Sequence, residues 1–139
     1  MRSETAIATV QPRLDRPLKP ATTLSGMRVF VAEDEPILLF ALEDVLGDFE
    51  CTVVGSATRV SEALDFVTGH TFDLAVLDAK LADGMIDPVI DVLAARGIPF
   101  IIVSGSSSSD YGSAVVVQKP YKDADLRQAL LRALVRNSA

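Results

Sequence analysis

The chain contains five short apolar runs, each about the length of a β-strand, and segments with helical periodicity separate most of them. The runs are rich in β-branched residues and cover residues 27–32, 52–57, 73–77, 100–103 and 115–118. Short runs that are apolar at nearly every position are typical of strands covered on both faces. Strands that alternate with helices form βαβ units around a parallel sheet. The sequence therefore predicts a single α/β domain built on a five-stranded parallel sheet.

Helical spacing of apolar residues is clear in the intervening segments. The first helix is predicted to begin near Pro36, where a missing N–H costs nothing, and to end near Gly47. Ser61 is predicted to cap the second helix. Two further helices are predicted over residues 86–96 and 123–135.

The connection between the fourth and fifth runs is short and rich in glycine and serine. A parallel crossover usually needs a dozen or more residues, commonly with a helix, and residues 104–114 offer fewer. We therefore expect the helix at this place to be shortened or missing. Ser106 to Ser109 are predicted to form a mobile surface loop.

The N-terminal segment differs from the rest of the chain. Pro12, Pro17 and Pro20 interrupt it, and its apolar residues have no period. Residues 1–24 are therefore predicted to be a flexible arm, followed by one domain over residues 25–139.

Charge and hydropathy exclude several function classes. The net charge of −6, without a basic cluster, argues against nucleic-acid binding. The sequence has no long uncharged stretch and no secretory signal pattern, so a cytoplasmic protein without membrane contact is expected. Cys51 has no partner for an internal disulfide, and we expect a small buried residue there. His70 is expected to be a solvated loop residue.

Polar side chains follow four of the predicted strands at the point where each strand ends. Glu33 and Asp34 follow the first, Asp78 the third, Ser104 the fourth and Lys119 the fifth. In parallel α/β sheets, ligand chemistry gathers at the carboxyl ends of the strands. Crowded carboxylates suit Mg²⁺, which prefers oxygen ligands and removes their mutual repulsion. A carboxylate beside such an ion can attack a phosphoryl group, and Asp78 is the best candidate for this nucleophile. Lys119 and Ser104 would then contact phosphoryl oxygens.

In these motifs the chain resembles the receiver domains of two-component response regulators. The resemblance covers about residues 27–135 and rests on "VAEDEP", "LAVLDAKL", "VSG" and "QKPY". It implies a flavodoxin-like (CheY-like), doubly wound five-stranded parallel sheet in the order 2-1-3-4-5. It also implies that Glu33 and Asp34 bind Mg²⁺ or Mn²⁺, that Asp78 is the phosphorylated residue, that Ser104 is the switch hydroxyl, and that Lys119 is the family's lysine. A cis Lys119-Pro120 peptide bond is expected on the same ground.

The chain also departs from the pattern of that family. Lys80 lies two residues after Asp78, where the family uses a backbone carbonyl as a metal ligand, so its carbonyl is a predicted ligand and its charge could alter the phosphate lifetime. Val116 stands nearest the place of the family's aromatic switch residue. Tyr111 is a hypothetical substitute for that aromatic.

The resemblance implies a phospho-accepting function. We expect no output domain after the last predicted helix, because the chain is similar to single-domain receivers of alphaproteobacteria. We expect a monomer or weak dimer that accepts phosphate from a histidine kinase or a histidine phosphotransfer protein, without being an enzyme for a separate substrate. Its output would be protein contact or service as a phosphate sink.

Two alternatives remain open from the sequence. A receiver-like module could bind a protein partner without phosphorylation. A haloacid-dehalogenase-like phosphatase would usually carry a second aspartate two residues after the first, and Lys80 occupies that position.

Overall fold

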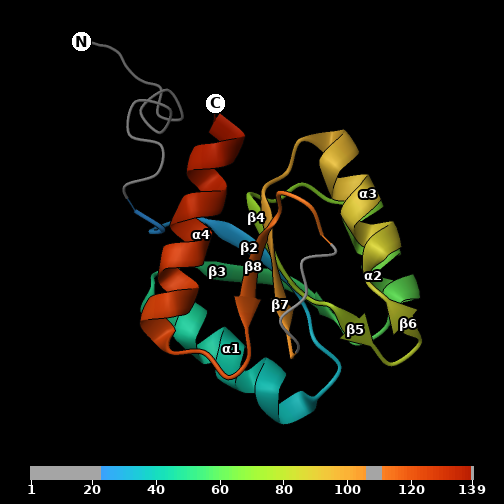
Figure 1. Cartoon of the computed structure of the whole chain (residues 1–139), viewed down its shortest axis with the longest axis horizontal. Coiled ribbons are helices and arrows are strands. Elements are labelled where there is room, and N and C mark those ends of the chain that lie inside the picture. Colours follow the sequence, from blue (N-terminus) through green and yellow to red (C-terminus); the bar gives the residue numbers. More distant parts are fainter. Residues whose placement is uncertain (1–22, 106–110, 139) are drawn as a thin grey trace, which may run out of the picture.

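Strands and helices alternate along the chain in the computed structural model, which describes residues 23–105 and 111–138 (Figure 1). The predicted α/β alternation is therefore confirmed. In chain order the elements are β2 (Arg28–Ala32), α1 (Pro36–Asp48), β3 (Thr52–Ala57), α2 (Val60–Gly69), β4 (Leu74–Asp78), β5 (Lys80–Leu81), β6 (Gly84–Met85), α3 (Asp87–Arg96), β7 (Phe100–Ser104), β8 (Val115–Gln118) and α4 (Asp123–Ser138).

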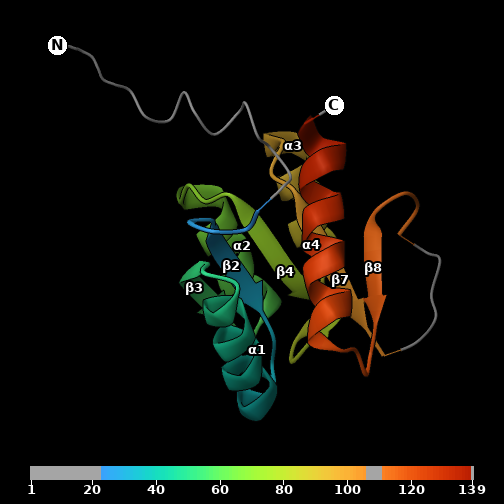
Figure 2. The same ribbon diagram turned by 90° about the vertical axis from the view of Figure 1, so that its left-hand side faces the viewer.

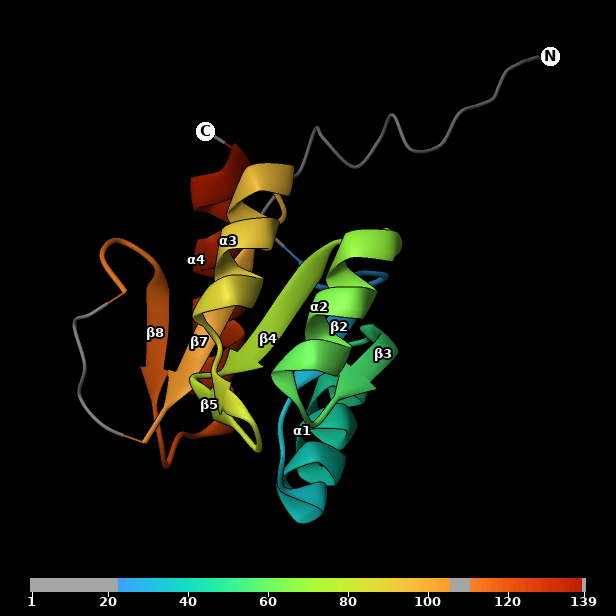
Figure 3. The same cartoon turned by 90° about the vertical axis from the view of Figure 1, so that its right-hand side faces the viewer.

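The main sheet has five parallel strands in the order β3-β2-β4-β7-β8. Counted along the chain, this is the predicted order 2-1-3-4-5. Helices α1 and α4 cover one face, and α2 and α3 cover the other (Figures 1 and 3). The strand order reverses between β2 and β4, which places the carboxyl ends of these two strands on either side of the crevice where ligands bind in such folds.

Each face of the sheet has its own hydrophobic core. Strand β4 divides them, because all of its residues are buried and successive side chains point to opposite faces. Leu74 and Val76 belong to the core under α1 and α4, whereas Ala75 and Leu77 belong to the core under α2 and α3. Leu24 also lies in the first core, although it falls in the segment predicted to be a flexible arm; residues 1–22 of that segment lie outside the described part.

Two helix boundaries differ from the sequence prediction. Ser61 does not cap α2, because the helix begins one residue earlier and the carboxylate of Asp83 accepts hydrogen bonds from the backbone N–H groups of Val60 and Ser61. The acceptor thus comes from another loop, which local spacing cannot reveal. Helix α4 extends to Ser138, beyond the predicted end at residue 135.

The segment after Asp78, predicted to be a loop, forms a small antiparallel hairpin of β5 and β6 (Figure 3). Leu81 anchors the hairpin in the core beneath α2 and α3. The turn consists of Ala82 and Asp83, and Gly84 begins β6 opposite Leu81. Gly84 has a φ of 147°, which favours glycine. The N–H of Ala82 donates to Thr58 O, so the hairpin is also tied to the loop before α2.

The connection between β7 and β8 contains a turn but no helix in its described residues, 105 and 111–114. This agrees with a shortened or missing helix at that place. The predicted mobile loop of Ser106 to Ser109 lies outside the described residues. Strand β8 therefore forms one edge of the sheet, with α4 beside it (Figure 2).

Candidate functional site

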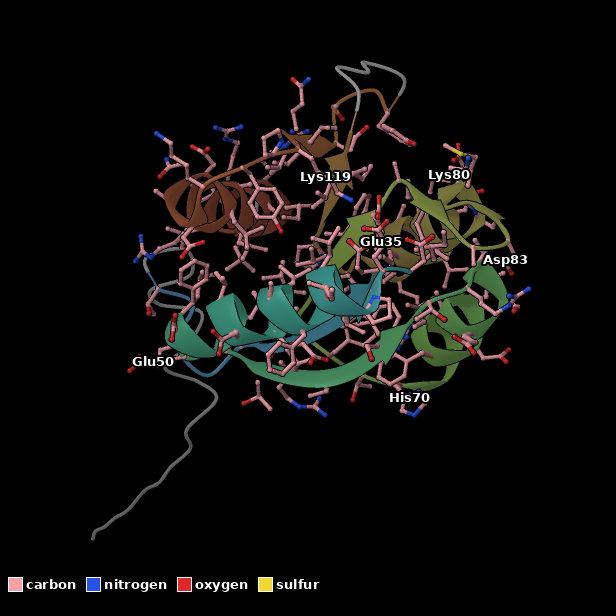
Figure 4. All side chains as sticks on the ribbon, turned by 90° about the horizontal axis from the view of Figure 1, so that it is seen from below. Glu35, Glu50, His70, Lys80, Asp83 and Lys119 are labelled. Carbon is pink, nitrogen blue, oxygen red and sulfur yellow. The ribbon has the colours of Figure 1, made fainter. Side chains whose placement is uncertain are left out.

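The polar residues singled out in the sequence meet at the carboxyl edge of the sheet. The parallel pairing aligns Ala32 with Leu77, Asp78 with Val103 and Ser104 with Gln118. The residues that end or follow these strands consequently share one edge. Figure 4 looks onto this edge and shows Lys119 directed toward its centre.

Three carboxylates gather at the centre of this edge. Glu33, Asp34 and Asp78 each offer an oxygen atom, and these atoms lie within 4.8 Å of one another. Glu33 is only 4% exposed and Asp78 only 8%, while Asp34 is half-buried. The backbone holds Glu33 in place, because its N–H donates to Ala57 O. Its Oε2 accepts a hydrogen bond of 3.1 Å from the N–H of Glu35.

Lys119 supplies the positive charge of the site. Its Nζ lies 3.0 Å from Asp78 Oδ2 and 3.6 Å from Glu33 Oε1. The backbone fixes its position, since its N–H donates to Ser104 O at 2.7 Å. The predicted cis peptide bond between Lys119 and Pro120 is present.

Burial and crowding change the proton affinity of two of these groups. Burial raises the pKa of Glu33 to about 7, and the charge of Asp78 adds to this effect, while the N–H of Glu35 and the charge of Lys119 oppose it. Burial lowers the pKa of Lys119, but Asp78 and Glu33 outweigh burial and raise it above its usual value. One ammonium group therefore does not compensate for all the carboxylates around it.

The donor set fits a hard divalent cation. Mg²⁺ prefers carboxylate oxygens and keeps several waters, and the three clustered oxygens provide such ligands. The pKa of Glu33 is raised because its negative charge would be buried and uncompensated. A bound cation would compensate this charge.

Ser104 and Lys80 belong to segments next to Asp78. Ser104 is buried at the end of the neighbouring strand β7. Lys80 begins the β5–β6 hairpin, and its N–H lies 3.5 Å from Asp78 Oδ1. The Lys80 side chain is exposed and lies apart from Lys119 in Figure 4. The role of its carbonyl as a metal ligand stays a prediction.

Tyr121 is a neighbour of the site to which the sequence reasoning gave no role. Its ring is half-buried against the core under α1 and α4. Burial raises the pKa of its hydroxyl, and the negative charge of Glu33 raises it further. The motif "QKPY" already placed this residue two positions after Lys119, which was a usable signal.

Tyr111 lies at the other end of the sheet from Ser104. With Phe100, Val115 and Arg136 it lines a cavity of about 320 Å³ near the starts of β7 and β8. This position gives no support to Tyr111 as a substitute for the aromatic switch residue. Val116 is half-buried in β8.

Cys51 and His70 lie where the sequence placed them. Cys51 is buried just before β3, and burial raises the pKa of its thiol to about 11. His70 is exposed after α2, where its ring stacks on Phe66 with centroids 4.0 Å apart. Neither residue belongs to the acidic cluster.

Comparison with known families decides the assignment. The sequence model of the response regulator receiver domain matches residues 29–131. The chain belongs to this family. Within the described residues, no helix has the length and apolar character needed to cross a bilayer.

The relatives include receivers of alphaproteobacteria, as predicted. The solution structure of SdrG from Sphingomonas melonis Fr1 is 34% identical, covers 79% of this chain and 97% of that chain, and has a TM-score of 0.69. The response regulator PhyR from Brucella abortus is 25% identical, covers 82% of this chain and 50% of that chain, and has a TM-score of 0.72. The transcriptional regulatory protein PdtaR of Mycobacterium tuberculosis is 28% identical over 129 residues, which are 86% of this chain and 62% of PdtaR. The chain thus spans about half of PhyR and less than two thirds of PdtaR.

Proposed function

We propose that this receiver domain accepts a phosphoryl group on Asp78 from a phosphohistidine donor and signals by protein contact or serves as a phosphate sink. The observation that carries the proposal is the position of the Asp78 carboxylate. It ends the central strand, lies among two further carboxylates, and has Lys119 Nζ at 3.0 Å. A structural ion pair would need only one carboxylate, so the crowding supports a site for a cation and a phosphoryl group.

Glu33, Asp34 and Asp78 would hold Mg²⁺ or Mn²⁺, with the Lys80 carbonyl as a further ligand. When bound, the ion neutralises charge on the transferring phosphoryl oxygens. The protein residues provide the remaining requirement, which is the position of the reacting carboxylate. Asp78 is attached to a strand in which every residue is buried, so its carboxylate has little freedom to move.

In the transfer step, an oxygen of the Asp78 carboxylate attacks the phosphorus of the donor. The P–N bond to the donor imidazole breaks, the new O–P bond forms an acyl phosphate, and the imidazole nitrogen takes up a proton. Hydrolysis later transfers the group to water, which restores the carboxylate and releases inorganic phosphate. The chain thereby promotes its own phosphorylation and dephosphorylation. It is not an enzyme for a separate substrate.

Lys119 and Ser104 would contact the phosphoryl oxygens. Lys119 Nζ is bound to Asp78 Oδ2 before the reaction, so it can pass to a phosphoryl oxygen without leaving the site. The Ser104 hydroxyl comes from the next strand and can donate to a second oxygen. These exchanges supply electrostatic stabilisation where charge develops.

The donor protein has an apolar surface available beside the site. The first turns of α1 follow the acidic pair directly, and there Ile37 is 82% exposed and Phe40 is 73% exposed. Large exposed apolar side chains grouped near a reactive residue indicate a protein contact. We propose that a histidine kinase or a histidine phosphotransfer protein contacts this turn while its phosphohistidine reaches Asp78.

The test is phosphorylation by acetyl phosphate with Mg²⁺, measured as the mass increase of one phosphoryl group. We expect labelling of the wild-type protein, loss of labelling in Asp78→Asn, and loss in excess chelator. Asp91→Asn is the matched control, because it changes an exposed aspartate on α3. Labelling of Asp78→Asn at the wild-type level would refute Asp78 as the acceptor.

A second candidate function is a binding module whose output needs no phosphorylation. Val116 in place of an aromatic, and the absence of a helix in the described residues between β7 and β8, favour it. Equal affinity of a partner for the free and the beryllofluoride-bound protein would support this alternative. A higher affinity for the beryllofluoride-bound protein would support phosphorylation-dependent output.

A further inference from the structure

The β5–β6 hairpin joins the reactive strand to the start of α2. Asp78 ends β4, and Lys80 begins the hairpin two residues later. Asp83 lies in the turn at the other end of the hairpin, and Figure 4 shows it well apart from Lys119. The hairpin therefore reaches from the acidic cluster to α2.

Asp83 caps α2 with both oxygen atoms of its carboxylate. Its Oδ1 accepts a hydrogen bond from the N–H of Val60, and its Oδ2 accepts one of 3.4 Å from the N–H of Ser61. The hydrogen bond from Val60 in particular holds the pKa of Asp83 below its usual value, so the capping carboxylate is charged at neutral pH. The residue before the helix, Arg59, makes no capping hydrogen bond with its side chain, and its solvent-exposed ion pair with Asp83, at 3.9 Å, adds little. The start of α2 thus takes its capping acceptor from the hairpin.

The hairpin is too small to keep its position without outside contacts. It has only two paired residues in each strand, and an isolated two-stranded hairpin is marginally stable at best. Leu81 fixes one face of it in the core under α2 and α3. The turn is fixed by its contacts with the segment that leads into α2, namely the Asp83 cap and a hydrogen bond of 3.3 Å from the N–H of Ala82 to Thr58 O. Loss of the cap would therefore free the turn and the strand residues next to it.

The backbone groups of Lys80 face the acidic pair. Along an extended strand, successive residues direct their N–H and C=O groups to opposite sides. Ala79 directs its N–H to Val103 O of β7 and its C=O to the N–H of Ile86. Lys80, the next residue, therefore directs its groups to the other side, where β2 and the acidic pair lie. In agreement with this direction, the N–H of Lys80 lies 3.5 Å from Asp78 Oδ1.

We propose that Asp83 is a positioning residue for the cation site: by capping α2 it holds the hairpin so that the Lys80 carbonyl stays beside the acidic cluster. The inference rests on the proposed function, because it takes Mg²⁺ as the ion and the Lys80 carbonyl as one of its ligands. A ligand that is already in place need not be ordered when the ion binds, so the site binds the ion more tightly. Groups that orient metal ligands without touching the metal commonly change its affinity by about 10–100-fold. The affinity for Mg²⁺ therefore depends on a helix cap at the far end of the hairpin.

Coupling of this kind acts in both directions. An ion that holds the Lys80 carbonyl also restrains the turn three residues later, and it thereby strengthens the bonds from Asp83 to the first turn of α2. The order of this first turn should consequently report whether the cation site is occupied.

The test compares two substitutions of Asp83 that remove the same charge. Asp83→Asn keeps a side-chain oxygen that can accept from Val60, whereas Asp83→Ala does not, and asparagine caps helices about as well as aspartate. We expect Asp83→Ala to bind Mg²⁺ about tenfold or more weakly than the wild-type protein in isothermal titration calorimetry, and Asp83→Asn to keep most of the affinity. Asp65→Asn is the control, since it neutralises an exposed aspartate of α2 outside the hairpin and should bind Mg²⁺ like the wild-type protein.

Hydrogen exchange tests the coupling in the wild-type protein and does not depend on the folding of a variant. Added Mg²⁺ should slow the exchange of the Val60 and Ser61 amides, which donate to Asp83. The amide of His70, which donates to Phe66 O at the other end of α2, should respond less. In Asp83→Ala the effect of Mg²⁺ on the first turn of α2 should disappear.

The outcomes separate this inference from the proposed function. A wild-type protein that does not bind Mg²⁺ would refute the cation site itself, and the role of Asp83 with it. If the wild-type protein binds Mg²⁺, three results overturn the role of Asp83 alone. They are an unchanged affinity in Asp83→Ala, an equal loss in Asp83→Ala and Asp83→Asn, and an exchange rate of the Val60 and Ser61 amides that does not respond to the ion.

Discussion

Replacing Glu33 by glutamine should remove the loss of stability that Glu33 causes in the metal-free protein at alkaline pH. The pKa of Glu33 is raised from 4.5 to about 7, so the folded state holds a proton that the unfolded state has lost between these values. The contribution of Glu33 to the free energy of unfolding is therefore fully present below pH 4.5 and is lost as pH rises through 7. A shift of about 2.5 units corresponds to about 3 kcal/mol, at about 1.36 kcal/mol per unit.

Glutamine resembles the protonated acid, and its amide oxygen can still accept the hydrogen bond from the Glu35 N–H. Glu33→Gln should thus differ little from the wild-type protein at pH 4.5. At pH 8 it should be more stable by an amount approaching about 3 kcal/mol. Subtracting the two profiles cancels the other titrating groups, which are common to both proteins.

The assay is urea unfolding in excess chelator at pH values from 4.5 to 8. Glu35→Gln is the control, because it removes an exposed carboxylate two residues along, and its profile should follow the wild-type protein. At pH 8, added Mg²⁺ should make the wild-type protein more stable than Glu33→Gln, since the wild-type protein keeps a metal ligand that the variant lacks. A difference between Glu33→Gln and wild type that stays constant with pH would refute the reasoning.

Two further changes test the surroundings of the site and the sheet. Lys119→Gln leaves the buried carboxylates of Asp78 and Glu33 without their neighbouring cation, so the metal-free protein should lose about 1–3 kcal/mol of stability in urea unfolding. Mg²⁺ should restore most of this loss, and an equal loss with and without the ion would contradict the electrostatic explanation. Gly55→Ala adds a Cβ that would overlap Cε2 of the Phe66 ring, so an overpacking cost of about 1–3 kcal/mol is expected. Gly69→Ala, whose Cβ would meet nothing within 4 Å, is the control, and equal stability of the two alanine variants would show that the ring moves aside freely.

The sequence predicted the sheet and the gathering of the polar residues at its carboxyl edge, because both depend on short-range patterns. Apolar runs of strand length located β2, β4 and β7, and the polar residue after each run had to lie at the shared carboxyl edge once the strands were parallel. That reasoning brought Asp78 and Lys119 together from positions 41 residues apart.

The features that the sequence did not predict depend on contacts between distant segments. Asp83 caps α2 across 23 residues, so the nearby Ser61 was a reasonable but wrong choice. The β5–β6 hairpin forms because Leu81 packs in the core under α2 and α3. This packing can be predicted only when the fold is already known. The proton affinity of Glu33 depends on its burial beside Asp78, and no motif reports burial.

Asp78 is the final residue of the central strand, and that strand is enclosed on both sides. Local opening is rarest in such an element, so the reacting carboxylate is attached to the most persistent part of the molecule. The surface that would meet the donor protein lies instead on the first turns of α1. Mutations there can redirect the domain to new neighbours during evolution while the chemistry at the strand tip is inherited unchanged.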